Sequence, residues 1–386
     1  MKLKQVNISQ TVMINTLALQ RKERGLPVFN LGAGEPVLKT PEVIKRAAEL
    51  ALKQNKTLYP PVAGLPQLRK STAEWLNKSY GADFKAENIL VANGGKLGLY
   101  LSLQMLLRPG DEVLIASPYW VSYPGIVKLF GGVPKIIKTT PSNGWRLTAN
   151  SVRQACGRKT KILILNNANN PTGALYSKGE LNEILRQAAK NNLTVISDEV
   201  YSNLVYDDGK FISCAGFAKY ADRVIVIQSC SKSFAMTGWR VGFACAPKPV
   251  IEVLTSLLSQ STSGVTTISQ WAAVAAMNKP EAFSLPIKKE MQKRRDVLAA
   301  ELARQFGIPF AKPESSLYFF IRMTDLGIKN VGSFDFCMRL LEKTGVALIP
   351  GSACGQEGYL RFSFGSTTKT LKAGVKILAQ FIHNQH

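Results

Sequence analysis

Polar side chains able to do chemistry stand directly after short apolar runs of the chain. Asp198 and Tyr201 follow one such run, and Lys232 follows another, inside a stretch rich in hydroxyl groups. A carboxylate at this position can pair with a cationic group of a ligand, and a lysine amine can bond covalently to a carbonyl compound. Each residue also has a structural interpretation, because Asp198 could cap the next helix and Lys232 could be a surface lysine.

Three further runs are followed by groups that suit a ligand. Gly95 and Lys96 open a helical pattern, where backbone N–H groups favour an anion such as phosphate. Trp120 follows a second run, and an indole ring can stack on a flat heterocycle. Asn170 lies in an amide-rich loop after a third run. A structural glycine turn, a core tryptophan and a capped loop remain open as alternatives for each of these features.

The apolar runs alternate with segments of helical spacing, which predicts strands separated by helices. Continuous apolar strands in this arrangement indicate a doubly wound, mostly parallel α/β sheet that is covered on both faces. In such a sheet, ligands bind beyond the carboxyl ends of the strands. The predicted strands are residues 89–92, 113–116, 162–165, 193–197 and 224–227.

The pattern changes near residue 286. A charged helical stretch, Lys288 to Glu301, precedes runs at 317–321, 346–349 and 359–363 with a helix among them, which predicts a smaller α+β domain. We therefore predict a large domain at residues 45–285 and a small domain made of 1–44 and 286–386. Periodicity alone does not decide where the N-terminal helix at residues 11–24 packs.

The five strand ends are predicted to meet at one edge of the sheet. A phosphate cradle, a stacking aromatic ring, an amide, a carboxylate, Lys232 and the nearby Arg240 would then surround one ligand. This combination suits a flat, phosphorylated, cationic heterocycle that a lysine holds covalently.

Composition excludes other kinds of chemistry. The only two histidines, His383 and His386, lie within the last four of 386 residues, so a histidine triad, base or metal site is not expected. The six cysteines contain no C-x-x-C pair, which predicts reduced thiols and no metal. Residues 1–7 show no signal peptide, and the longest apolar-rich run is far shorter than the roughly 20 residues of a membrane span. We expect a cytoplasmic protein.

The chain is strongly basic, with 49 Lys and Arg against 26 Asp and Glu and a net charge of +23. Basic clusters such as 158–161 and 293–295 are short and lack interleaved aromatic residues. A solvated cationic surface is therefore favoured over nucleic-acid binding, and no nucleic-acid or membrane partner is expected.

In sequence order, these motifs resemble those of the pyridoxal-phosphate enzymes of the aspartate aminotransferase family (fold type I), particularly its bacterial, Thermus-like subgroup. The resemblance covers essentially the whole chain. It implies a large domain with a doubly wound sheet, a smaller α+β domain, and ping-pong transfer of an amino group. The motifs are Gly32–Pro36, Tyr59–Arg69, Asn93–Lys96, Pro118–Pro124, Asn170–Gly173, Asp198–Tyr201, Ser231–Lys232 with Arg240, and Arg361–Ser363.

The resemblance implies a role for each residue around the cofactor, pyridoxal 5′-phosphate. Lys232 matches the lysine that forms a Schiff base with the cofactor and moves the substrate proton. Asp198 matches the carboxylate facing the pyridine nitrogen, and Trp120 matches the ring-stacking aromatic. Tyr201 and Asn170 match the groups that hydrogen-bond the ring oxygen.

The resemblance also implies contacts with the cofactor phosphate. They would come from backbone N–H groups, hydroxyls and a guanidinium, those of Gly95, Lys96, Ser229, Ser231 and Arg240. Tyr59 matches a tyrosine that reaches this phosphate from the neighbouring subunit. The resemblance therefore implies a homodimer with active sites at the subunit interface.

Substrate binding is implied for Arg361, which matches the arginine that grips the α-carboxylate, with Gly34, Trp120 and Asn170 nearby. Lys96 matches a lysine associated with the distal carboxylate of aspartate, which favours aspartate with 2-oxoglutarate. The chain has Val37-Leu38 where the family often has Asp-Phe. Aromatic, alanine-type or prephenate-type substrates, C–S lysis and, more distantly, a non-catalytic cofactor-binding regulator of nucleic acids therefore stay open.

Overall fold

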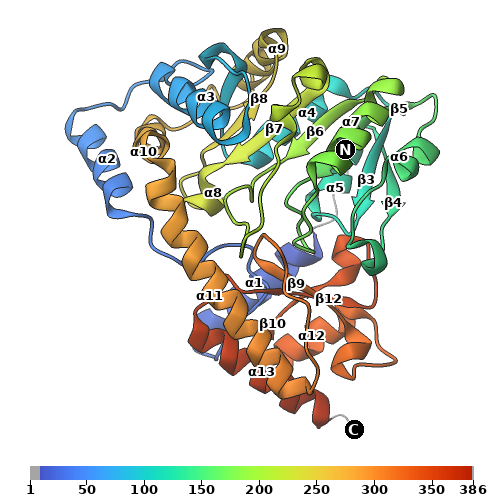
Figure 1. Ribbon diagram of the computed structural model, residues 1–386. Coiled ribbons are helices and arrows are strands. Elements are labelled where there is room, and N and C mark those ends of the chain that lie inside the picture. The colour runs from blue at the N-terminus through green and yellow to red at the C-terminus, as the bar shows by residue number, and fades with distance from the viewer. Residues whose placement is uncertain (1–8, 385–386) are drawn as a thin grey trace, which may run out of the picture.

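The computed structural model describes residues 9–384, so His386 and the segment examined for a signal peptide lie outside the described residues. A seven-stranded sheet occupies the upper part of the molecule in Figure 1. Its order is β2-β8-β7-β6-β5-β3-β4, and all neighbours are parallel except at β8, which is antiparallel to β2 and β7. The strands are β2 (Ile89–Ala92), β3 (Glu112–Ser117), β4 (Val133–Lys138), β5 (Thr160–Asn166), β6 (Thr194–Asp198), β7 (Val224–Ser229) and β8 (Gly242–Cys245).

The predicted runs correspond to β2, β3, β5, β6 and β7, whose side chains are almost all buried. Two strands were missed. β4 lies at an edge of the sheet and carries Pro134, the half-buried Lys135 and the exposed Lys138, which is the composition of an edge strand rather than of a buried run. β8 is a four-residue strand that begins at Gly242, and its length and glycine hid it from a search for longer apolar runs.

Helices cover both faces of this sheet and create two apolar cores. The helix α7 shows why such segments fold as they do. Ser177 and Glu180 form a capping box at its start, and Leu181, Ile184 and Leu185 lie buried on one face. One face is covered by α4 (Gly95–Leu106), α5 (Ser122–Leu129) and α9 (Lys248–Ser259), the other by α2 (Glu42–Lys53), α3 (Pro66–Tyr80), α6 (Ala149–Ala155), α7 (Lys178–Lys190) and α10 (Thr267–Asn278).

The lower part of the molecule contains the first described helix, the C-terminal elements and a third apolar core (Figure 1). A three-stranded antiparallel sheet has the order β11-β12-β9, and β1 pairs in parallel with β10. The run predicted as one strand at 346–349 is two strands, because Leu348 separates residues that pair with different partners. The elements are α1 (Gln10–Glu23), β1 (Phe29–Asn30), α11 (Pro280–Phe306), β9 (Tyr318–Arg322), α12 (Ser333–Thr344), β10 (Val346–Ala347), β11 (Ile349–Pro350), β12 (Tyr359–Ser363) and α13 (Thr368–His383).

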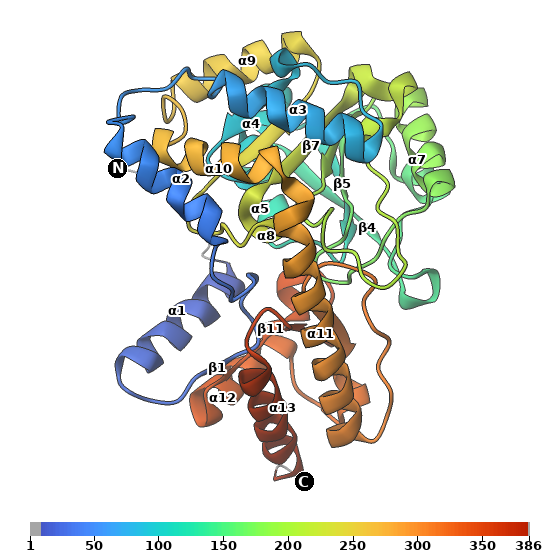
Figure 2. The ribbon, with the colours of Figure 1, turned by 60° about the vertical axis from the view of Figure 1, so that its left-hand side comes forward.

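The N-terminal helix α1 packs against α12, β10 and β11. We propose the division into a large domain of residues 45–285 and a small domain of 1–44 with 286–386. The boundary at 285/286 lies inside α11, which runs from the upper part of the molecule down beside α13 (Figure 2).

Other composition-based expectations can be compared with the described residues. None of the described helices combines the length and the apolar character needed to cross a membrane. All six cysteines are unpaired, and all except Cys156 are buried. His383 ends α13, where its Nδ1 lies 2.8 Å from the Ala379 carbonyl oxygen.

Candidate active site

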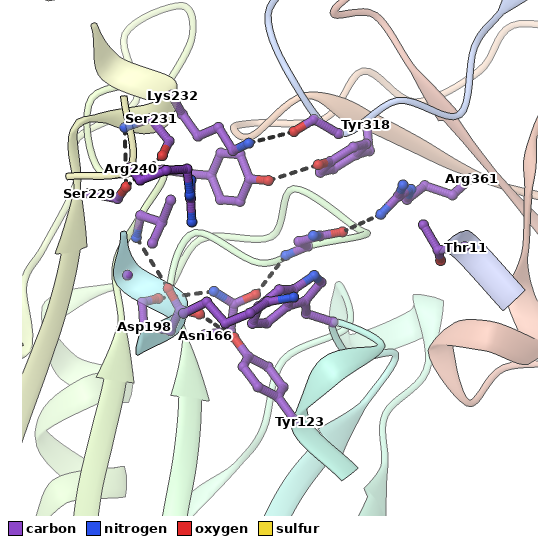
Figure 3. A pocket seen from close by; sticks show the side chains of 17 residues that line it. Thr11, Tyr123, Asn166, Asp198, Ser229, Ser231, Lys232, Arg240, Tyr318 and Arg361 are labelled. Carbon is purple, nitrogen blue, oxygen red and sulfur yellow. Dashed lines mark hydrogen bonds between the residues drawn. The ribbon is translucent and has the colours of Figure 1, made fainter. Parts of the chain in front are cut away.

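One pocket lies between the carboxyl ends of the large sheet and the lower part of the molecule, and it measures about 210 Å³ (Figure 3). The strand ends meet there because β2, β3, β5, β6 and β7 all run in the same direction. The structure places every sequence-predicted site residue except Tyr59 in this pocket. Its lining is Thr11, Gly34, Gly95, Lys96, Trp120, Tyr123, Asn166, Asn170, Asp198, Val200, Tyr201, Ser229, Ser231, Lys232, Arg240, Tyr318 and Arg361.

One end of the pocket has the chemistry of an anion site. Gly95 begins α4, and its backbone is preceded by Gly94 at φ +78°, a conformation that favours glycine. The Ser229 Oγ accepts a hydrogen bond from the Ser231 N–H at 3.1 Å and also donates to the Ser231 Oγ at 2.9 Å. The guanidinium of Arg240 lies so close to Gly94 that a β-carbon there would collide with it. These groups offer N–H, O–H and cationic donors together.

Lys232 lies in the short helix α8 (Cys230–Ser233), directly after β7. Its Nζ donates a hydrogen bond to the Gly34 carbonyl oxygen at 2.6 Å. The pKa of Lys232 is lowered from 10.5 to about 8, mainly by burial; Glu35 opposes this shift, and the positive charges of Arg240 and Arg361 add to it. The amine is therefore partly neutral, and nucleophilic, near neutral pH.

Asp198 ends β6 and is buried. Its Oδ2 accepts a hydrogen bond from the Tyr123 hydroxyl at 2.6 Å, and its Oδ1 lies 3.4 Å from the Val200 N–H. Burial raises the pKa of Asp198, and the hydrogen bond from Tyr123 opposes that shift. Within residues 9–384 no lysine, arginine or histidine forms an ion pair with this carboxylate. A buried carboxylate that lacks an ion-pair partner in the described chain suits a cationic ligand group.

Tyr201 and Tyr318 both line the pocket and contact each other through their hydroxyl groups. Their hydroxyl oxygens lie 2.7 Å apart, and burial raises the pKa of both phenols. Tyr318 also packs against Arg361, whose guanidinium carbon lies 4.3 Å from the ring centre. The phenol of Tyr201 thus remains a protonated hydrogen-bond donor at neutral pH.

Arg361 lies on β12 and is 3% exposed. Its two terminal nitrogens donate to the Asn170 Oδ1 at 3.2 Å and to the Gly32 carbonyl at 2.8 Å. Its Nε has no hydrogen-bond partner among the described residues. A buried guanidinium with spare donors that faces a pocket suits a carboxylate.

The remaining cation of the pocket is Lys96, whose Nζ lies 4.8 Å from the centre of the Trp120 ring. Burial lowers the pKa of Lys96, and the charge of Arg240 lowers it further. Trp120 also meets Tyr123 edge to face, with ring centres 5.3 Å apart. The flat indole therefore lies at the ligand side of the pocket between a cation and a phenol.

The structure adds lining residues that sequence reasoning missed. Tyr318 is the first residue of β9 and Tyr123 is the second residue of α5, and aromatic side chains in these elements resemble core residues. Thr11 lies in α1, far from the other site residues in sequence, and Val200 has no polar side chain. Asn166, the last residue of β5, had a detectable signal because it begins the amide-rich stretch after that strand.

Tyr59 lies outside this pocket. Its side chain is 93% exposed, and it lines a separate open groove with residues 57–60 and 262–268. The neighbouring Leu58 is 81% exposed. The role expected for Tyr59 involves a second subunit and stays a prediction.

Three observations indicate that the pocket fits pyridoxal phosphate. The Asp198 carboxylate, without an ion-pair partner in the described chain, matches a protonated ring nitrogen. The glycine and serine end, with Arg240, matches a phosphate. The amine of Lys232, with its pKa lowered to about 8, matches an aldehyde.

The chain belongs to the family described as aminotransferase class I and II, whose model matches residues 27–378. It is therefore a pyridoxal-phosphate-dependent aminotransferase of fold type I. A protein of Aquifex aeolicus named probable aspartate/prephenate aminotransferase is 38% identical over 95% of this chain and 94% of its own length. The aspartate/prephenate aminotransferase of Thermus thermophilus is 37% identical over 97% of this chain and 96% of its own.

Solved structures agree with this assignment. The aspartate aminotransferase of Thermus thermophilus with maleate has a TM-score of 0.92 and 36% identity, and the match covers 98% of this chain and all of that one. The aspartate aminotransferase of Thermotoga maritima has a TM-score of 0.90 and 33% identity over 98% of both chains.

Proposed function

We propose that the enzyme transfers the amino group of aspartate to 2-oxoglutarate in a ping-pong cycle. The observation that carries this proposal is that two cations, Lys96 and Arg361, line the same pocket as the reactive amine of Lys232. A substrate with two carboxylates can meet both cations with its amino group near Lys232. Aspartate in the names of several relatives supports the same choice.

We propose that the amine of Lys232 holds the cofactor and, once released, moves the substrate proton. Pyridoxal phosphate, when bound, supplies an electron-withdrawing ring that stabilises negative charge at the substrate Cα. A pKa of about 8 makes the neutral amine of Lys232 available as a base near physiological pH. The hydrogen bond to the Gly34 carbonyl orients this amine toward the substrate side of the pocket.

Four side chains are proposed to act on the cofactor ring. Asp198 would keep the ring nitrogen protonated, while Tyr123 holds the carboxylate in place. Tyr201 and Asn170 would donate hydrogen bonds to the ring oxygen. Because the Asn170 Oδ1 already accepts from Arg361, its NH₂ group is left as the donor. Trp120 would stack on the ring face.

The phosphate of the cofactor is proposed to lie at the glycine and serine end of the pocket. Backbone N–H groups at the start of α4 and two hydroxyls would donate to it, and a guanidinium would neutralise its charge. These groups belong to Gly95, Lys96, Ser229, Ser231 and Arg240.

We propose a homodimer, in which Tyr59 reaches the phosphate of the neighbouring subunit. The nearly full exposure of Tyr59 and Leu58 supports this assembly, because large apolar side chains that project freely are a common feature of interfaces. A cytoplasmic location is also proposed, and the unpaired thiols support it.

A panel of amino donors with 2-oxoglutarate tests the proposed reaction. We expect aspartate to be the preferred donor, and substitution of Lys96 by Met to raise the aspartate KM more than the alanine KM. Reduction with borohydride should attach the cofactor to Lys232, and Lys232→Ala should abolish turnover. Preferred turnover of tyrosine, alanine or prephenate-derived donors, or of cystathionine by C–S lysis, would instead support the other substrate classes.

A further inference from the structure

Arg294, in the middle of α11, is a buried cation outside the pocket and is 5% exposed. Its Nε donates to the Glu290 carboxylate of the same helix at 2.8 Å. Its other two nitrogens face backbone carbonyls: one donates to the Gly365 oxygen at 2.6 Å, and both approach the Val37 oxygen at 3.3 and 3.4 Å. One guanidinium therefore connects a helix to two separate chain segments.

Both of these segments lead directly into the pocket. Gly34, whose carbonyl accepts the hydrogen bond from Lys232, precedes Val37 by three residues. Arg361 precedes Gly365 by four. The two segments also touch each other, because the Val37 N–H donates to the Gly365 oxygen at 2.8 Å. Arg294 thus joins the backbone near Gly34 to the backbone near Arg361.

The helix that carries Arg294 is held in place by its own packing, so it can fix the position of both segments. α11 packs against α8, which contains Lys232, and against α13 along its lower half (Figure 2). Its buried face belongs to the lower apolar core through Ile287, Met291 and Leu298. A side chain fixed to this helix can transmit the position of the helix to the two segments.

We propose that Arg294 is a positioning residue that sets the spacing between Gly34 and Arg361, and thereby the affinity of the enzyme for the substrate carboxylate. The proposal rests on the proposed role of Arg361 in carboxylate binding. Loss of Arg294 removes the guanidinium donor from the Val37 and Gly365 carbonyls, and only the Gly365 oxygen keeps another donor, the Val37 N–H, so the two segments lose their link to α11 and can shift. Displacement of a carboxylate-binding group by less than an ångström weakens binding although every pocket residue is still present.

Calorimetric binding of maleate, a dicarboxylate without an amino group, to the holoenzyme tests this proposal. We expect Arg294→Met to weaken maleate binding about tenfold. The aspartate KM should rise in parallel, and kcat should change less because Arg294 does not contact Lys232. Arg294→Lys should recover part of the affinity, because an ammonium group can reach one of the carbonyls but lacks the planar fork.

Arg304→Met is the matched control, because Arg304 lies on the same helix but is exposed and pairs with Glu301 instead of with the two segments that lead to the pocket. It should leave maleate binding unchanged. Arg361→Lys separates the two proposals. If Arg361→Lys binds maleate weakly but folded Arg294→Met binds it with wild-type affinity, the positioning role of Arg294 alone is overturned. If Arg361→Lys binds maleate with wild-type affinity, the carboxylate role of Arg361 and the positioning role of Arg294 are overturned together. If Arg294→Met does not fold, wild-type affinity in Arg294→Lys overturns the positioning role.

Discussion

At the scale of single residues, the pocket combines groups whose pKa values are shifted by burial. Burial lowers the pKa of Lys232 and raises that of Asp198, and these shifts have opposite signs because burial disfavours the charged form of each group. A bound cofactor with a cationic ring would relieve the cost at Asp198. A bound ligand of complementary charge would thus stabilise the charged forms of these polar groups.

The pKa of Lys232 can be tested in the cofactor-free protein. Because only a neutral amine is acylated, we expect labelling of Lys232 by acetic anhydride to show a midpoint near pH 8. The folded state binds this proton less tightly than the unfolded state, so the contribution of Lys232 to the free energy of unfolding should rise between about pH 8 and pH 10.5 and be constant below. Peptide-resolved mass spectrometry measures the labelling, with exposed lysines as internal controls, and a midpoint near 10 contradicts the prediction.

At the scale of elements, the sheet and the helix α4 must approach closely to form the phosphate end of the pocket. Gly242 of β8 lies opposite Ser229 of β7, directly beneath the start of α4. A β-carbon on Gly242 would collide with the Gly95 nitrogen and lie 2.9 Å from the Gln228 carbonyl oxygen, and backbone atoms cannot rotate away as the end of a flexible side chain can. A glycine at the start of β8 is therefore required by packing.

We expect Gly242→Ala to lower the free energy of unfolding by about 2 kcal/mol and to weaken binding of pyridoxal phosphate, because α4 must move away from the sheet. Gly125→Ala in α5 is the matched control. Apart from its chain neighbours and the backbone of its own helix, no atom of the described residues lies within 4 Å of a β-carbon built on Gly125, so this change should stabilise the protein by about 0.5–1 kcal/mol. Denaturant unfolding and cofactor titration measure the two effects, and wild-type cofactor affinity in Gly242→Ala would disprove the packing argument.

At the scale of the whole molecule, one predicted site residue, Tyr59, lies outside the pocket of its own chain. Tyr59 is almost fully exposed and is absent from the pocket lining. The proposed homodimer would account for this position, because the symmetry of two identical subunits would give each site one tyrosine from its partner. Of the net charge of +23, only the part carried by pocket cations such as Lys96 and Arg361 is explained, because these cations suit anionic ligands.

Mixed dimers test this arrangement. Tyr59→Ala and Lys232→Ala should each impair activity at limiting cofactor. A dimer with one subunit of each kind should regain one intact site, and therefore about half of the wild-type activity. The two variants are tagged differently, mixed and isolated as mixed dimers. If Tyr59 serves the site of its own chain, the mixed dimer gains nothing over the parents.

Sequence patterns predicted the strands that position the site because buried parallel strands are continuous apolar runs, as in β5 and β7. They missed β4 and β8, whose lysines, proline and glycine reflect edge position and close packing rather than burial alone. Tyr318 was missed for a related reason. Its hydroxyl contact with Tyr201 joins residues that are 117 positions apart, and no local pattern records such a contact.

The sequence by itself determined the class of chemistry, because a lysine, an aspartate, a tyrosine and a glycine-rich helix start each follow an apolar strand, and parallel strands end at a common edge. Only the tertiary structure decided the pKa values and the contacts of these groups. The lowered pKa of Lys232, the carboxylate of Asp198 without an ion pair in the described chain, and the link from Arg294 to Gly34 and Arg361 all depend on burial and on contacts between distant segments. Such contacts form only when the chain is folded.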